Sequence, residues 1–365
     1  MFPEQYYYPV YIYSLLLISA VQYYQLQGMP RGVLLHVREE RGSTWVFGLL
    51  FIVMVGLRPV AAIFGDTESY AIIYEGYQSG SIVYNPGSSE WLFYKLMSTC
   101  AQQMDVQGFY LIVEVFYIIP MLWACKRLFP YNMGIAVLFC VAGFSFFSYG
   151  VNGIRNGMAC SFLLLAFSFM HGKKWDKVLA TLCCLVALSV HRSTALPVTC
   201  MLIAYFYRNT KMLMAFWVFS IFISLVAGGA LDTLFSSLGF DSRLSHYINN
   251  RTHDSAFSHT GFRWDFLLYS MMPIVLGWYV VIRKGIASRR YLFLLHTYIL
   301  SNAFWVMLIR SSFSNRFAYL SWFMYPLVIA YPLLTLPIWK EQGRMVGMIL
   351  MAHVGFTYFM WIVRG

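Results

Sequence analysis

Long apolar stretches alternate with short polar connections along almost the whole chain. Most of these stretches approach the ~20 residues that a helix needs to cross the ~30 Å hydrocarbon core of a bilayer. We therefore expect an all-α fold, a polytopic transmembrane helical bundle that forms a single integral membrane domain over residues 1–365. The pattern predicts about 12 spans, at 6–26, 44–64, 107–125, 131–149, 153–171, 176–190, 194–207, 212–231, 264–282, 291–309, 317–338 and 345–363.

The composition agrees with this fold class. Hydrophobic residues make up 59% of the chain and charged residues only 11%, which no soluble fold requires. The first apolar run has no basic leader and no small-residue cleavage site, so we expect it to be a retained span. The seven cysteines lack zinc-like spacing and are typical of small packing residues. No disulfide framework, metal site or cofactor is therefore expected.

The cations are sorted between alternate connections. One set holds seven of the eight lysines, and the positive-inside rule assigns it to the cytoplasm. Its members are Arg31, Arg38, Arg41, Lys126, Arg127, Lys173, Lys174, Lys177, Arg208, Lys211, Arg283, Lys284, Arg289, Arg290, Lys340 and Arg344. This alternation requires two short helices within 176–207 that meet near His191, and it places both termini outside. The net charge of +11 is then a loop bias and no sign of nucleic-acid binding.

The opposite side carries fewer cations, and nearly all of them are arginine. A guanidinium is a planar fork of donors that suits phosphate, so this set indicates a phosphate-bearing substrate. The alternative is that these side chains snorkel to the interface or pair with nearby carboxylates. The set is Arg58, Lys95, Arg155, Arg192, Arg243, Arg251, Arg263, Arg310, Arg316 and Arg364. Two long outer loops, about 65–106 and 232–263, are expected to shape or cover a site.

The segment around His191 is the sharpest motif. The helix predicted over 176–190 spans only ~22 Å, which sinks the turn at His191 and Arg192 below the outer surface. Ser193 is expected to cap the next helix, whose free N–H groups then attract an anion. A helical hairpin with a polar tip is the alternative.

Two further outward helix starts carry an arginine in the first turn. Asn152 is expected to cap the helix that contains Arg155, and Ser314 the helix that contains Arg316. A cation at a helix N-terminus opposes the helix dipole. Both positions therefore indicate an anion between the arginine and the helix N-terminus, either a ligand or an outer-loop carboxylate.

Charged residues also lie near the outer end of two spans. Arg58 is a functional candidate because an intramembrane arginine is costly, although a structural pair with Glu114 explains it equally well. Asp66 and Glu68 follow that span, and this Asp-x-Glu pair suits either a divalent metal or a general base.

Short motifs along most of the chain resemble the EpsG family, the Wzy-like polymerases of bacterial exopolysaccharide, capsule and O-antigen synthesis. They are Gly56-Leu57-Arg58, Gly65-Asp66 with Tyr70, Ser89-Glu90-Trp91-Leu92-Phe93, Asn152-Gly153-Ile154-Arg155-Asn156-Gly157-Met158-Ala159, Ala187-Leu188-Ser189-Val190-His191-Arg192-Ser193-Thr194-Ala195 and Ser314-Asn315-Arg316-Phe317-Ala318-Tyr319-Leu320. The resemblance implies a GT-C-like or Wzy-like bundle in the bacterial inner (cytoplasmic) membrane, with its active site facing the periplasm. It also implies transfer of a glycan from undecaprenyl diphosphate onto another lipid-linked repeat unit. The implied partners are the lipid-linked donor and acceptor, membrane lipids and a chain-length regulator.

Within that chemistry we expect His191, Asp66 and Arg155 to be catalytic. His191 or Asp66 is the base for the acceptor hydroxyl, and Arg155 stabilises charge on the leaving diphosphate. The expected substrate-binding residues are Arg58, Glu90, Asn152, Arg192, Ser193, Arg251 and Arg316, with Glu90 positioning the acceptor or supporting an arginine.

Two other functions stay open at this stage. One is a polyprenyl-phosphosugar glycosyltransferase that adds a single sugar, with Asp66 and Glu68 holding a metal. The other is a flippase for the lipid-linked glycan. Arg58 and Glu114 are both biased to the outer side, which argues against the alternating access of a flippase.

Overall fold

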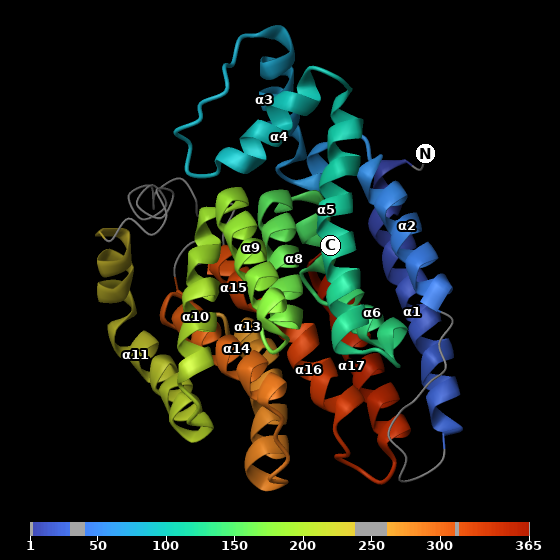
Figure 1. The fold of residues 1–365 in the computed structure, drawn as a ribbon, viewed down its shortest axis with the longest axis vertical. Coiled ribbons are helices and arrows are strands. Elements are labelled where there is room, and N and C mark those ends of the chain that lie inside the picture. The colour runs from blue at the N-terminus through green and yellow to red at the C-terminus, as the bar shows by residue number, and fades with distance from the viewer. Residues whose placement is uncertain (1–2, 30–40, 238–260, 311–313, 365) are drawn as a thin grey trace. The chain divides into compact units, whose positions relative to one another are not determined.

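A computed structural model describes residues 3–29, 41–237, 261–310 and 314–364, and every regular element in these ranges is helical (Figure 1). Among the described residues, five helices are long and apolar enough to cross a membrane. They are Val106–Leu128, Thr210–Ala227, Trp264–Arg283, Asn315–Thr335 and Gln342–Val363. These helices confirm the class of helical membrane protein, whereas the count of about 12 spans stays a prediction.

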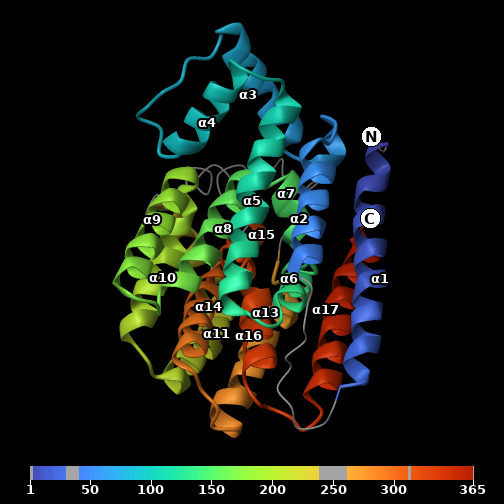
Figure 2. The same ribbon diagram turned by 45° about the vertical axis from the view of Figure 1, so that its right-hand side comes forward.

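The chain divides into two compact units, one of residues Met1–Thr194 and Ala330–Gly365 and one of residues Ala195–Ile329. The first unit contains the 3-10 turns Glu4–Tyr6, Ala62–Phe64 and Arg192–Thr194 and the helices α1 (Tyr7–Gln27), α2 (Arg41–Gly56), α3 (Thr67–Ser79), α4 (Trp91–Ala101), α5 (Val106–Leu128), α6 (Met133–Val141), α7 (Phe146–Val151), α8 (Ile154–Phe169), α9 (Lys174–Val190) and α17 (Gln342–Arg364). In this unit α1 packs on α17, α2 on α5, α5 on α8 and α8 on α9 (Figure 2). The helices α3 and α4 lie together beyond one end of α8 and α9 (Figure 1).

The ends of α5 and α9 are fixed by side chains of the local sequence. Asp105 caps α5, because its carboxylate accepts a hydrogen bond from the Gly108 N–H at 2.8 Å. At the other end of α5, Arg127 forms an ion pair with Asp176 at 2.8 Å. Asp176 also accepts a hydrogen bond from the N–H of Lys173, the N-cap of α9, at 2.9 Å. One carboxylate thus ties the end of α5 to the start of α9.

The structure corrects the single span predicted over 131–149, because α6 and α7 are separate short helices. A break in a helix exposes carbonyl groups, which inside a membrane need other donors. His353 Nε2 of α17 lies 3.1 Å from the carbonyl oxygen of Phe139. Thr357 of α17 donates its hydroxyl to the carbonyl oxygen of Ala142 at 2.7 Å. These two side chains satisfy the end of α6, so the helix can stop there.

The span predicted over 44–64 is also shorter than expected, because α2 ends at Gly56. Pro59 follows closely, and proline disfavours the helical conformation of the residue before it. Arg58 is that residue, so it lies in the connection after α2. The predicted outer loop 65–106 contains α3 and α4, and residues 238–260 of the predicted loop 232–263 lie outside the described residues.

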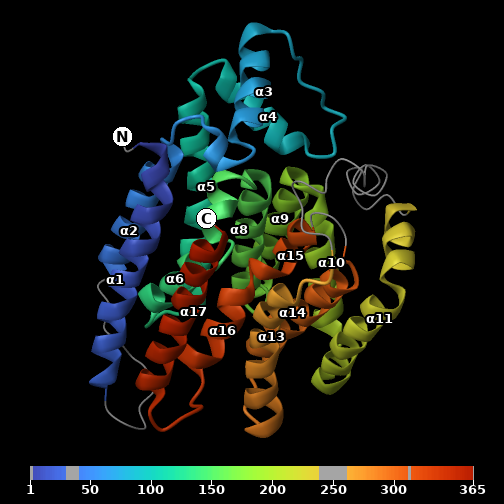
Figure 3. The ribbon, with the colours of Figure 1, turned by 180° about the vertical axis from the view of Figure 1, so that it is seen from behind.

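The second unit is built around α14 (Figure 3). Its elements are α10 (Ala195–Phe206), α11 (Thr210–Ser237), α13 (Trp264–Gly277), the π-helix η5 (Trp278–Arg283), α14 (Arg289–Met307) and α15 (Ser314–Trp322), and α16 (Tyr325–Thr335) runs from this unit into the first. In its core Trp217 Nε1 donates to Asn302 Oδ1 at 2.8 Å, and Asn302 Nδ2 donates to Ser321 Oγ at 3.0 Å. Such bonds between apolar helices hold them together where burial of apolar surface contributes little.

Candidate active site

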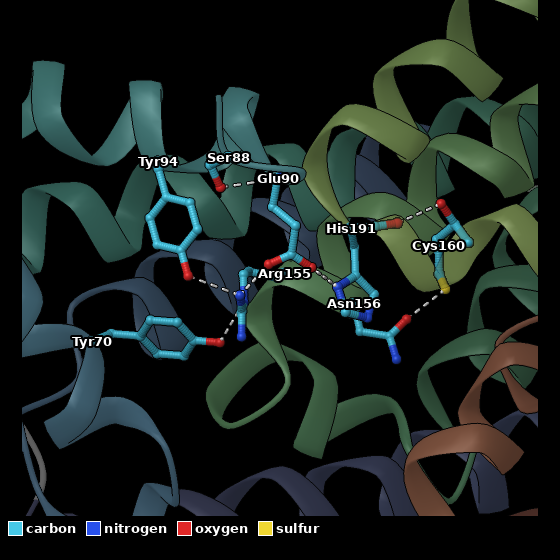
Figure 4. A network of polar contacts seen from close by, with 9 residues as sticks. Tyr70, Ser88, Glu90, Tyr94, Arg155, Asn156, Cys160 and His191 are labelled. Carbon is cyan, nitrogen blue, oxygen red and sulfur yellow. Dashed lines mark hydrogen bonds and ion pairs between the residues drawn. The ribbon is translucent and has the colours of Figure 1, made fainter. Parts of the chain in front are cut away.

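Glu90 joins three helices in the largest charged network of the described first unit (Figure 4). The residue is the N-cap of α4, and its N–H donates to Ser88 Oγ at 3.3 Å. Its carboxylate forms an ion pair with Arg155 through Oε2 and lies 2.6 Å from His191 Nδ1 through Oε1. The side chains of Glu90, Arg155 and His191 are only 12%, 9% and 15% exposed. The three side chains are therefore largely shielded from water.

Arg155 lies in the first turn of α8, as predicted. The predicted cap of this helix is wrong, because Gly153 is the N-cap and Asn152 is the C-cap of α7. An arginine beside the positive end of a helix is destabilising unless an anion compensates it. The carboxylate of Glu90 provides that anion, as the outer-loop carboxylate alternative expects, and a further ligand anion stays a prediction.

Two further hydrogen bonds of Arg155 go to tyrosine hydroxyls (Figure 4). Its Nε donates to Tyr70 OH at 3.1 Å and its Nη1 to Tyr94 OH at 3.1 Å. The guanidinium carbon is also 5.9 Å from the ring centre of Phe93. Within the described part of the chain, Nη2 of Arg155 makes no hydrogen bond. This nitrogen is the donor that a bound phosphate oxygen can take.

Sequence reasoning missed the contacts of Tyr70 and Tyr94 with Arg155. Tyr94 follows Glu90 by four residues at the start of a helix, and this spacing places two side chains on one face. The sequence therefore contained a signal that Tyr94 lies beside Glu90. Tyr70 stands in the motif with Asp66, but nothing in its neighbourhood points to a partner that is 85 residues away.

His191 is the C-cap of α9 and has an extended backbone, with φ −148° and ψ 109°. Its N–H donates to the Ala187 carbonyl at 2.9 Å, and its own carbonyl accepts the Thr194 hydroxyl at 2.7 Å. A carboxylate only accepts hydrogen bonds, so the contact with Glu90 assigns the ring proton to Nδ1. In the neutral imidazole, Nε2 then carries the lone pair and can accept a proton. The predicted helix end at His191 is confirmed.

The residues after His191 differ from the prediction. Ser193 was expected to cap the following helix, but it lies inside the 3-10 turn Arg192–Thr194, and α10 begins at Ala195. Thr194 uses its hydroxyl to close this turn, which explains why Ser193 is not the cap. Arg192 is exposed beside His191. A phosphate group beside His191 therefore lies near the guanidinium of Arg192 as well as that of Arg155.

Asp66 and Asn152 are brought together, but away from the Glu90 network. The N–H of Asp66 donates to Asn152 Oδ1 at 2.9 Å, and Asp66 is the N-cap of α3. The residue before it, Gly65, has φ +66° and ψ −121°, a conformation that side-chain-bearing residues rarely adopt. A Cβ on Gly65 would also lie 2.5 Å from the Asn152 side chain. Asn152 thus supports the turn that leads into α3.

Arg58 is fully buried and its contacts are internal. Its Nη1 donates to the Val55 carbonyl at 2.9 Å and lies 3.6 Å from Glu114 Oε1. Its Nη2 donates to the Val151 carbonyl at 3.4 Å, and its guanidinium covers the Tyr110 ring at 4.5 Å. These contacts favour the structural pair with Glu114 over a direct contact with substrate.

The last two predicted arginines are not part of the network as described. Arg316 lies in the second unit, in the first turn of α15, and is half-buried. Ser314, its predicted cap, is instead the first residue of that helix. Arg251 lies outside the described residues. The convergence of all the predicted arginines on one pocket stays a prediction.

Metal-binding donors are sparse around Asp66 and Glu68. Within the described ranges, no group of three or more His, Cys, Asp or Glu residues is arranged to hold a metal ion. The two carboxylates therefore have no further ligand of these kinds beside them in that part of the chain.

The fold and the site together define a helical membrane protein with a carboxylate–histidine–arginine network beside the helical cap α3–α4. The sequence model of the EpsG family matches residues 44–365, which is nearly the whole chain. The chain belongs to the EpsG family, a family of Wzy-like polysaccharide polymerases. Comparisons with curated proteins and with solved structures found no match.

Proposed function

We propose that the protein polymerises undecaprenyl-diphosphate-linked oligosaccharide repeat units at the periplasmic face of the bacterial inner membrane. Membership in the EpsG family supports polymerisation in general. The observation that carries the proposed mechanism is the bridge that Glu90 makes between Arg155 and His191. Through this bridge one carboxylate contacts both the proposed base, His191, and the proposed phosphate-binding cation, Arg155.

His191 is the proposed general base. Its Nε2 takes the proton of the acceptor sugar hydroxyl while the hydroxyl oxygen attacks the anomeric carbon of the donor. Glu90 holds the ring in the tautomer with Nδ1–H and stabilises the imidazolium that forms. A glycosidic C–O bond forms as the C–O bond to the diphosphate breaks.

The lipid diphosphate leaves with the electron pair of the broken bond, so negative charge grows on its oxygens. Arg155 has one nitrogen without a hydrogen bond in the described chain, and Arg192 is exposed next to His191. We propose that these two guanidiniums stabilise the developing charge. Arg316 and Arg251 are further proposed contacts of the diphosphate.

Asp66 is the other predicted base, but its surroundings suit that role less well. It has no contact with the Glu90 network, and its hydrogen bond to Asn152 is made by the backbone N–H. A base gains most from a partner that stabilises its protonated form, and His191 has such a partner in Glu90. We therefore favour His191.

Replacement of His191 and of Arg155 by alanine tests the proposal. In cells that make the polymer, H191A and R155A should each abolish the polymer while complete single repeat units accumulate on the lipid. Immunoblots or gels of lipid-linked glycans from the periplasmic leaflet measure this. Polymer of normal length from both variants would overturn the proposal.

The same measurement, made on the glycans of each membrane leaflet, distinguishes the polymerase from a single-sugar glycosyltransferase and from a flippase. Accumulation of a repeat unit that lacks one sugar would indicate a single-sugar glycosyltransferase. Accumulation of complete units in the cytoplasmic leaflet would indicate a flippase. Either outcome contradicts the proposed polymerase.

A further inference from the structure

The segment that connects α3 to Glu90 is exposed but anchored at both ends. Gly80 ends α3 in the left-handed conformation, with φ +76°. The N–H of Ile82 then donates back to the Gly76 carbonyl at 2.9 Å. Near the other end, the N–H of Gly87 donates to Asn85 Oδ1 at 2.9 Å, which closes a tight turn. The segment therefore holds a defined shape beside the candidate active site.

Aromatic side chains gather on this segment and on the adjoining helices. Tyr84 donates its hydroxyl to the Trp91 carbonyl at 3.4 Å, and Lys95 Nζ lies 5.3 Å from the centre of the Tyr84 ring. Burial raises the pKa of Tyr77, and the nearby phenols of Tyr94 and Tyr84 raise this pKa further. We name Tyr77, Tyr84, Trp91, Tyr94 and Lys95 the α3–α4 aromatic surface.

This surface is not the packing face of α4. The packing face consists of Phe93, Met97 and Cys100, which are 0%, 0% and 4% exposed. Trp91, in contrast, is 42% exposed, and Val83 in the connecting segment is 82% exposed. Neither α3 nor α4 is among the helices long and apolar enough to span a membrane in the described chain. Packing against the core therefore does not explain the position of the Trp91 ring.

The surface is continuous with the catalytic network. Trp91 directly follows Glu90 in the chain, and the Tyr94 hydroxyl accepts a hydrogen bond from Arg155 Nη1 at 3.1 Å. A ligand that lies over Trp91 and Tyr84 consequently has its end next to Glu90 and His191.

We propose that the α3–α4 aromatic surface is the binding site for the acceptor oligosaccharide. Aromatic faces carry negative electrostatic potential and attract the C–H groups on the apolar face of a pyranose ring. The phenol hydroxyls and the ammonium group of Lys95 bind sugar hydroxyls at the ring edge. The arrangement presents the terminal sugar hydroxyl of the acceptor to His191. This inference rests on the proposed polymerase function and adds the location of one of its two substrates.

The test uses the full-length protein in lipid nanodiscs and two probes. The first probe is the soluble oligosaccharide released from the purified polymer, whose binding is measured by calorimetry without any turnover. The second is polymerisation at fixed donor and varied acceptor concentration. The variants are Tyr84→Ala and Trp91→Ala, with Trp91→Phe as the conservative replacement. Ile72→Ala is the matched control, because Ile72 is an exposed residue of α3, 68% accessible, that lies outside the surface as defined.

Tyr84→Ala and Trp91→Ala should each weaken oligosaccharide binding about 10-fold and raise the KM for acceptor by a similar factor, with kcat near that of the unchanged protein. Trp91→Phe should restore most of the affinity, and Ile72→Ala should change neither quantity. Unchanged binding and unchanged KM in both alanine variants would overturn the inference. Quenching of the protein's fluorescence by brominated lipids that is lost in Trp91→Phe, with unchanged sugar binding in the alanine variants, would also overturn it and assign the surface to the membrane interface. A protein that binds the oligosaccharide but forms no polymer would instead contradict the proposed function alone.

Discussion

Glu90 and His191 are separated by 101 positions in the sequence, yet the Glu90 carboxylate lies 2.6 Å from His191 Nδ1. Arg155 binds the same carboxylate, so one acidic side chain organises both basic groups. A buried carboxylate is costly unless its oxygens are paired, and both oxygens of Glu90 have a basic partner. The charge state and the orientation of Glu90 therefore control the whole network.

Replacement of Glu90 by glutamine should inactivate the protein without unfolding it. The amide retains the size of the side chain and one acceptor oxygen, but it cannot stabilise an imidazolium or neutralise Arg155. We expect kcat to fall about 100-fold or more, the range for loss of general-base assistance. Polymer formation from lipid-linked repeat units in nanodiscs measures this, with thermal unfolding as the control. A rate within twofold of the original would contradict the assigned role.

Replacement of Asp66 by asparagine separates the two candidate bases. The bond between Asp66 and Asn152 uses the Asp66 backbone, so the local structure should persist. Activity within about threefold of the original is expected if His191 is the base, because removal of a true base costs far more. A loss of activity as large as that of His191→Ala, in a variant with unchanged thermal unfolding, would assign the base to Asp66.

Replacement of Gly65 by alanine should destabilise the protein more than the same change at Gly80. Both glycines have positive φ, +66° and +76°. A Cβ on Gly65 would meet the Asn152 side chain at 2.5 Å, whereas a Cβ on Gly80 would meet nothing within 4 Å. We expect Gly80→Ala to cost about 1 kcal/mol of unfolding free energy and Gly65→Ala about 1–3 kcal/mol more.

The comparison is made by thermal unfolding in one detergent, together with polymer formation. Gly65→Ala should also reduce activity, because the displaced Asn152 lies three residues before Arg155. Equal unfolding temperatures for the two variants would show that the contact with Asn152 has no energetic role.

Replacement of Arg58 by methionine should be strongly destabilising. Arg58 and Glu114 are 1% and 0% exposed in their side chains, so removal of the cation leaves an unpaired buried carboxylate. Breaking a buried pair from one side costs about 3–5 kcal/mol. The double variant Arg58→Met and Glu114→Met should recover much of this loss, because no charge stays behind.

Unfolding of the original protein, of Arg58→Met, of Glu114→Met and of the double variant in detergent gives the coupling energy between the two residues. A double variant no more stable than Arg58→Met would argue against the ion pair. Recovered polymer formation in the double variant would in addition exclude Arg58 as a group that must contact substrate.

The hydrophobic pattern predicted the fold class and most helix positions, because each helix in a membrane must satisfy its own backbone. The pattern could not predict where helices break. The stop of α6 depends on His353, which is 214 residues away from the carbonyl that it contacts. The end of α2 was predictable in principle, since Pro59 follows it.

Much of the candidate site was also predicted as a set of residues, though not as a set of contacts. His191 and Arg155 were predicted from their positions at helix ends, and Glu90 from its motif, with support of an arginine as one of its two expected roles. The placement of Arg155 at a helix start correctly indicated a nearby anion. That this anion is Glu90 could not be predicted, because Glu90 and Arg155 are 65 positions apart and no local spacing brings them together.

All members of the Glu90 network precede residue 195, within the first of the two compact units. The groups of the proposed proton transfer consequently come from one contiguous stretch of the chain. In the proposed mechanism the second unit, Ala195–Ile329, therefore acts on the diphosphate through Arg251 and Arg316 and takes no part in the proton transfer.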